Sequence, residues 1–170
     1  MTNRKCRQLV LQIAAVLSAL AVCSCGNTDR PLRPSYSHFE RIPTDGWDPT
    51  DIIQFEPWPL DSAEAANNVY RMDLVLRYSA RNSLGSLPLA LTIEDGNGET
   101  ITDTIVIGNG PAGVRKPTWH ERTQYGVREV TAGLQEHVRL SDGYAVSISP
   151  LIERNNTVGL LNVGLMLTRE

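Results

Sequence analysis

The sequence predicts an all-β protein, and three observations support this. Residues 69–79 alternate: five apolar side chains fall on one face and three charged ones on the other, which are Tyr70, Met72, Leu74, Leu76 and Tyr78 against Arg71, Asp73 and Arg77. A second pair of alternating runs is joined by residues 95–98, Asp-Gly-Asn-Gly, a strong hairpin signal. No long amphipathic helix separates the runs. We therefore expect one antiparallel β-sandwich, with a jelly roll as one form it could take.

About eight strands are expected, at the spacing typical of a sandwich. Their ranges in chain order are 36–42, 51–56, 69–79, 87–93, 100–107, 136–140, 144–149 and 160–168. The connections are rich in Pro, Gly, Asp and Asn, which favour turns. Residues 60–68 are polar and contain alanines, so they fit either a loop or one helical turn.

The first 24 residues are predicted to be a lipoprotein signal peptide. A basic start, with Arg4, Lys5 and Arg7, precedes an apolar run over residues 9–22 that is too short to span a bilayer comfortably. The small Ser24 before Cys25 resembles the bacterial lipobox, so we expect cleavage before Cys25 and acyl chains such as palmitate on it. A soluble secreted protein cut near the same place is the alternative.

Cysteine usage and charge agree with a lipid anchor. All three cysteines lie within residues 6–25, so the processed chain keeps Cys25 alone and has no internal disulfide. Removing three of the 16 basic residues with the signal leaves 13 against 19 acidic ones, a formal charge of −6. An acidic chain without a basic cluster argues against nucleic acid and against electrostatic membrane binding. Membrane attachment is therefore expected through the acyl chains.

Residues 25–35 are expected to form the lipidated cysteine and a flexible tether, and residues 36–170 one folded domain. Pro31 and Pro34 among polar residues are typical of an extended linker. The remaining length is enough for one hydrophobic core without metal or disulfide support.

The order of these features resembles the GldH family of gliding-motility lipoproteins of Bacteroidetes. The resemblance rests on Tyr36, Phe39, Ile42-Pro43, Gly46-Trp47, Asp51, Phe55, the strand at 70–78, residues 95–98 with Asp103-Thr104, and residues 159–165. It implies a non-catalytic cell-envelope protein on the cell membrane or outer membrane. It also implies protein partners in a surface motility or secretion apparatus. A carbohydrate- or polymer-binding sandwich of the cell surface is the alternative function.

Several motif matches are expected to be structural. Residues 108–113 fit GxGxxG, but no helix follows to bind a pyrophosphate, so no dinucleotide is predicted. Asp45, Asp48 and Asp51 lack the ligand spacing of a calcium loop. Asp95, Asn97 and Glu99 come closer to it but coincide with the predicted hairpin turn, which favours Asp and Asn for backbone reasons, so no metal is predicted. His38, His120 and His137 are scattered and form no recognisable catalytic motif, so neither enzyme activity nor a cofactor is expected.

The candidate site residues are aromatic or hydroxyl-bearing. Trp47, Trp58 and Trp119 stand in loop-like sequence, where each is either a core edge or a contact residue for a partner. On one exposed face they would instead stack on sugar rings. The resemblance further implies O-glycosylation within Asp-Ser/Thr-aliphatic triplets, at Ser62 or Thr104. Ser62, in a predicted loop, is the preferred acceptor.

Overall fold

The computed structural model describes residues 34–57, 67–82, 85–109 and 114–170. The chain divides into two compact units, Met1–Pro31 and Leu32–Glu170, and every described residue belongs to the second. The predicted signal peptide, Cys25, most of the tether, Trp58 and Ser62 lie outside the described residues. Within the described ranges, none of the helical structure has the length and apolar character needed to cross a bilayer.

The described residues form nine strands and one short 3₁₀ helix, η1 (Arg154–Thr157). The strands are β1 (Tyr36–Arg41), β2 (Ile53–Phe55), β3 (Tyr70–Ser79), β4 (Ser86–Glu94), β5 (Thr100–Gly108), β6 (Trp119–Gln124), β7 (Val127–Val138), β8 (Ala145–Pro150) and β9 (Leu160–Arg169).

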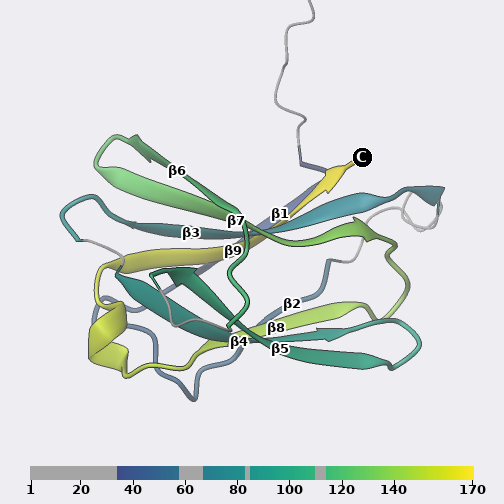
Figure 1. Cartoon of the computed structure of the whole chain (residues 1–170), viewed down its shortest axis with the longest axis horizontal. Coiled ribbons are helices and arrows are strands. Elements are labelled where there is room, and N and C mark those ends of the chain that lie inside the picture. Colours follow the sequence, from purple (N-terminus) through teal and green to yellow (C-terminus); the bar gives the residue numbers. More distant parts are fainter. Residues whose placement is uncertain (1–33, 58–66, 83–84, 110–113) are drawn as a thin grey trace, which may run out of the picture. The chain divides into compact units, whose positions relative to one another are not determined.

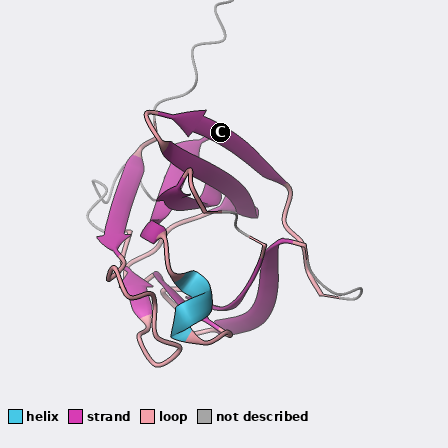
Figure 2. Cartoon of the chain, turned by 90° about the vertical axis from the view of Figure 1, so that its left-hand side faces the viewer, coloured by secondary structure: helices cyan, strands magenta, loops and turns pink. Residues whose placement is uncertain are grey.

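The strands make two antiparallel sheets that pack face to face, which confirms the all-β sandwich. One sheet has the order β1-β9-β3-β7-β6 and the other β2-β8-β4-β5. Figure 1 shows the first sheet above the second. In Figure 2 the 3₁₀ helix lies at the end of the sandwich that faces the viewer.

Eight of the strands pair as a nested ribbon. β4 pairs with β5, β3 with β7, β2 with β8, and β1 with β9, so the first strand meets the last and the pairs close inward. Successive pairs alternate between the two sheets, which is a jelly-roll arrangement. β6 is outside this ribbon and is added at the edge of the larger sheet, next to β7.

The core lies between the sheets and contains the predicted face of β3. Tyr70, Met72, Leu74, Leu76 and Tyr78 are all buried. Alternate residues of the neighbouring strands complete this layer, among them Val163, Leu165, Val130 and Ala132. Leu89, Leu91, Ile105, Ile107, Val146 and Ile148 supply the facing layer from the smaller sheet.

The outer face of β3 is less exposed to solvent than its charge pattern predicts. Val75 and Asp73 point away from the core, yet both are buried. The Phe39 ring covers Gly164 next to Val75, since a Cβ on that glycine would lie 2.3 Å from the ring. Asp73 accepts a 3.0 Å hydrogen bond from Arg71 Nε.

The prediction for residues 119–140 was wrong. A strand was expected at 136–140, but β7 runs from Val127 to Val138, and β6 was not predicted at all. The sequence of β6, Trp-His-Glu-Arg-Thr-Gln, has no apolar period because both of its faces are exposed.

Candidate functional site

Trp47 belongs to the core, which decides between the two alternatives left open for it and removes it from the candidate contact residues. Its side chain is 1% exposed, and its indole N–H donates a 2.8 Å hydrogen bond to the carbonyl of Asp51. Its backbone N–H donates to Thr157 Oγ1 at 2.6 Å, which ties the β1–β2 loop to η1. Gly46 permits this contact, because a Cβ there would lie 2.2 Å from the Arg154 carbonyl oxygen.

Two acidic residues of the β1–β2 loop stabilise the same contact between this loop and η1. Arg154 reaches Asp45 at 3.1 Å and Asp48 at 2.8 Å. Hydrogen bonds from the Thr50 hydroxyl and backbone N–H, with the nearby Arg154 charge, lower the pKa of Asp48. These carboxylates hold a loop against a helix.

The second acidic set closes the β4–β5 hairpin. Asp95 Oδ1 accepts the backbone N–H groups of Asn97 and Glu99, each at 2.9 Å. These bonds, the one from Glu99 foremost, lower the pKa of Asp95. The described residues contain no group of three or more potential metal ligands.

The three histidines stand on different parts of the larger sheet. His38 on β1 contacts Glu40 at 2.7 Å, and its ring packs edge-on against Phe55 with centroids 6.0 Å apart. His137, at the end of β7, contacts Glu170 at 2.6 Å. His120 lies exposed on β6, at the opposite edge from His38. The fold does not bring the three together.

Thr104 lies exposed in β5. Asp103, the acidic residue of the predicted glycosylation triplet, is already paired with Arg115. Asp103 accepts a 2.9 Å hydrogen bond from Arg115, which lowers the pKa of the carboxyl group.

Gly108, the first glycine of the GxGxxG match, ends the same strand with φ of 86°. The chain is next described from residue 114, and Arg115 forms an isolated bridge with Ile105.

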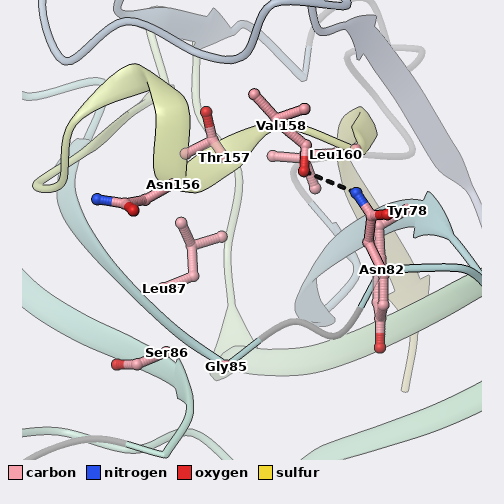
Figure 3. A pocket seen from close by; sticks show the side chains of 10 residues that line it. Tyr78, Asn82, Gly85, Ser86, Leu87, Asn156, Thr157, Val158 and Leu160 are labelled. Atoms are coloured by element: carbon pink, nitrogen blue, oxygen red, sulfur yellow. Dashed lines mark hydrogen bonds between the residues drawn. The ribbon is translucent and has the colours of Figure 1, made fainter.

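Two adjoining hollows lie at the η1 end of the sandwich, one of ≈ 30 Å³ and one, more open, of ≈ 580 Å³. Both are lined by Asn82 and by residues 158–160. Asn82 connects two segments that line the hollows, because its side-chain N–H donates to the Val158 carbonyl at 2.9 Å (Figure 3). Among the described lining residues only Arg41, in the larger hollow, carries a charge at neutral pH, so the smaller hollow offers neutral hydrogen-bonding groups.

A different surface lies on the outer face of the larger sheet, beside the β6–β7 turn. We call it the hairpin surface; it surrounds a concavity of ≈ 330 Å³ and consists of Arg77, Arg122, Gln124, Tyr125, Val127 and Glu129. Arg77 and Arg122 share one carboxylate, that of Glu129, with Nε–oxygen distances of 2.8 Å each. The surface therefore carries a net positive charge on a chain that is acidic overall.

Tyr125 forms the tip of the hairpin surface in a conformation that favours glycine. It is 95% exposed, with φ of 50°, and Gly126 follows with φ of 78°. These two residues make a two-residue turn with both φ angles positive, a position where Asn-Gly is preferred. A bulky residue in the left-handed region is strained by roughly 1–3 kcal/mol, and such strain clusters at functional sites.

Trp119 begins β6 and is 40% exposed, which places one of the predicted contact tryptophans at an accessible edge. Its neighbours on β6 were missed by sequence reasoning. The one usable signal was the pair Tyr125-Gly126 between polar runs, since an Xaa-Gly pair also marks hairpin turns.

Comparisons of the chain with protein-family models, curated proteins and solved structures found no match. The resemblance to the gliding-motility lipoproteins stays a prediction.

Proposed function

We propose that this chain is a lipid-anchored, non-catalytic lipoprotein of the bacterial cell envelope, held through Cys25 on the cell membrane or outer membrane. It acts by protein–protein contact within a surface motility or secretion apparatus. The lipobox-like sequence around Cys25 and the resemblance to the GldH family support the location and the apparatus.

The hairpin surface is the observation that carries the proposal of protein contact. It combines a fully exposed tyrosine with two arginines, and Tyr and Arg are among the residues enriched at binding hot spots. Tyr125 adopts a strained backbone conformation that other residues would adopt more easily. This supports a role for its exposed side chain, since the turn alone would not favour tyrosine. Several of the candidate ionisable groups, by contrast, are engaged in structural contacts, as Asp48 is with Arg154.

The carbohydrate-binding alternative depended on Trp47, Trp58 and Trp119 sharing one exposed face. Trp47 is buried, so that face does not exist as predicted.

Two experiments test the proposal. Cys25→Ala should move the protein from the membrane to the soluble fraction or leave it unprocessed. A mature N-terminus downstream of Cys25 without lipid, found by mass spectrometry, would refute the anchor.

The contact function is tested by complementing a deletion strain and measuring co-purifying partners. Tyr125→Ser should abolish complementation and partner recovery while the domain stays folded. Ile101→Ser is the matched control, because Ile101 is also an exposed apolar residue, 59% exposed, but lies on the smaller sheet. Loss of function confined to His38 and Glu40, or to His137 and Glu170, with partners unchanged would point to an active site instead.

A further inference from the structure

β6 forms an unpaired edge of the larger sheet and is the one described strand in which every residue is exposed. All six residues of β6 are exposed, and its one paired strand is β7. The edges of the smaller sheet are less available: β2 has three residues, and β5 is bridged by Arg115, whose carbonyl accepts the Val106 N–H at 3.0 Å. β1 is the other edge of the larger sheet, and its inner face is packed against Phe55 through His38.

The pairing with β7 fixes which backbone groups of β6 point outward. The Gly133 N–H donates to the Thr118 carbonyl at 3.0 Å, so the position before β6 is hydrogen-bonded to β7. Such positions alternate in an antiparallel pair. His120, Arg122 and Gln124 therefore bond to β7, and the N–H and C=O groups of Trp119, Glu121 and Thr123 face away from it.

We propose that this edge binds an extended segment of a partner protein as an added antiparallel strand, and that the segment alternates carboxylate and apolar side chains. The inference rests on the proposed function and names the chemistry of the partner. An added strand gains affinity from main-chain hydrogen bonds and specificity from alternate side chains.

The charge of Arg122 determines which side chains the incoming strand should present on its outer face. The residue opposite Arg122 is in a non-hydrogen-bonded pair, where side chains approach most closely. Arg122 is 71% exposed and shares its carboxylate, Glu129, with Arg77, so a second carboxylate opposite it is favourable. On the inner face the incoming residue beside Trp119 should be apolar, because that ring is partly exposed.

A second copy of the chain is a poorer occupant. In an antiparallel two-fold pairing of β6 with itself through its outward N–H and C=O groups, two registers overlap by five residues; one sets Glu121 opposite Glu121, and the other sets Arg122 opposite Arg122. Like charges placed directly opposite destabilise a strand pair. A different protein whose strand places carboxylates opposite Arg122 avoids this repulsion.

The test uses the full-length chain in detergent micelles and a short capped peptide that alternates valine and glutamate. A peptide alternating valine and lysine is the matched control. The glutamate peptide should bind more tightly, lose affinity as salt is raised, and protect the amides of Trp119, Glu121 and Thr123 from hydrogen exchange. Equal binding of both peptides, protection along β1 instead, or no binding at millimolar peptide overturns the proposal.

Two variants sharpen the result. Thr123→Pro removes one outward N–H without breaking the ladder to β7, and should weaken glutamate-peptide binding by roughly tenfold or more. Arg122→Gln should weaken it by about twofold to fivefold and reduce the preference over the lysine peptide. Unchanged binding in both variants refutes the edge as the site.

Two further measurements separate this inference from the proposed function. If Thr123→Pro abolishes a concentration-dependent dimer seen by sedimentation, the occupant is a second copy and the proposal is wrong. If native partners still co-purify with Thr123→Pro while Tyr125→Ser loses them, strand addition fails and partner binding through the hairpin surface stands.

Discussion

The guanidinium carbon of Arg77 lies 3.9 Å from the centroid of the Phe39 ring, on the outer face of the larger sheet. Phe39 can lie flat there because the residue opposite it on β9 is Gly164. The glycine thus allows an aromatic ring and a cation to cover Val75, and it connects the β1 edge with the Arg77–Glu129–Arg122 network of the hairpin surface.

Gly164→Ala should destabilise the domain. The added Cβ would lie 2.3 Å from the Phe39 ring and 2.9 Å from the His38 carbonyl oxygen. Displacing the ring is an overpacking change, expected to cost about 1–3 kcal/mol in the free energy of unfolding measured by urea. Gly85→Ala is the control, because a Cβ there meets nothing within 4 Å, and it should not lower stability.

Thr157→Val should separate the β1–β2 loop from η1. The hydroxyl accepts the Trp47 N–H at 2.6 Å and donates to the Arg154 carbonyl at 2.7 Å, so the isosteric valine leaves a buried N–H unpaired. The expected loss is about 1–3 kcal/mol in urea unfolding, with quenching of buried tryptophan fluorescence by acrylamide as a second readout. Thr102→Val, at an exposed position of β5, should be nearly neutral. Equal effects at both positions would contradict the anchoring role.

Tyr125→Asn should stabilise the hairpin and at the same time weaken partner recovery. Asparagine accepts a left-handed conformation more readily than tyrosine, so a gain of about 1 kcal/mol is expected. The fully exposed ring is lost, and with it the aromatic part of the hairpin surface. Tyr125→Phe should change neither stability nor partner recovery much. A stabilised Tyr125→Asn variant that retains every partner would show that the tyrosine is dispensable.

Asp103 should make the domain less stable in acid. Its hydrogen bond from Arg115 lowers its pKa in the folded state below the ordinary value of 3.8. Between the two pKa values the unfolded chain binds the additional proton, so the stabilisation is present above the unfolded value and is lost as pH falls through the folded one. Urea unfolding from neutral pH down to acid should show a smaller loss of stability below pH ~4 in Asp103→Asn than in the wild type. An identical pH profile would contradict this.

The sequence predicted elements whose signals are local. The alternation of β3 is read directly from five apolar residues, because one face of the strand is covered by the other sheet. The β4–β5 hairpin was predicted from Asp95 to Gly98, since its turn needs the positive φ of 81° that Gly98 adopts.

Elements that depend on distant partners could not be predicted. Trp47 stands in a sequence rich in Pro, Asp and Gly, and its partner Thr157 is 110 residues away. β6 is exposed on both faces and is a strand only because β7 supplies its hydrogen bonds. The hairpin surface joins β3 to the β6–β7 turn, so its arginines could not be grouped before the register was known.

The position of β6 also determines how the domain would transmit force. A pull that enters the chain before Tyr36 reaches β1, at one edge of the larger sheet, while a partner on β6 would hold the other edge. Tension between them crosses four ladders in series. The outer two, β1 with β9 and β6 with β7, have six residue pairs each, whereas each inner ladder of β3 has nine. Under such tension the outer ladders should open first, which would release the partner or β1 before the core is exposed.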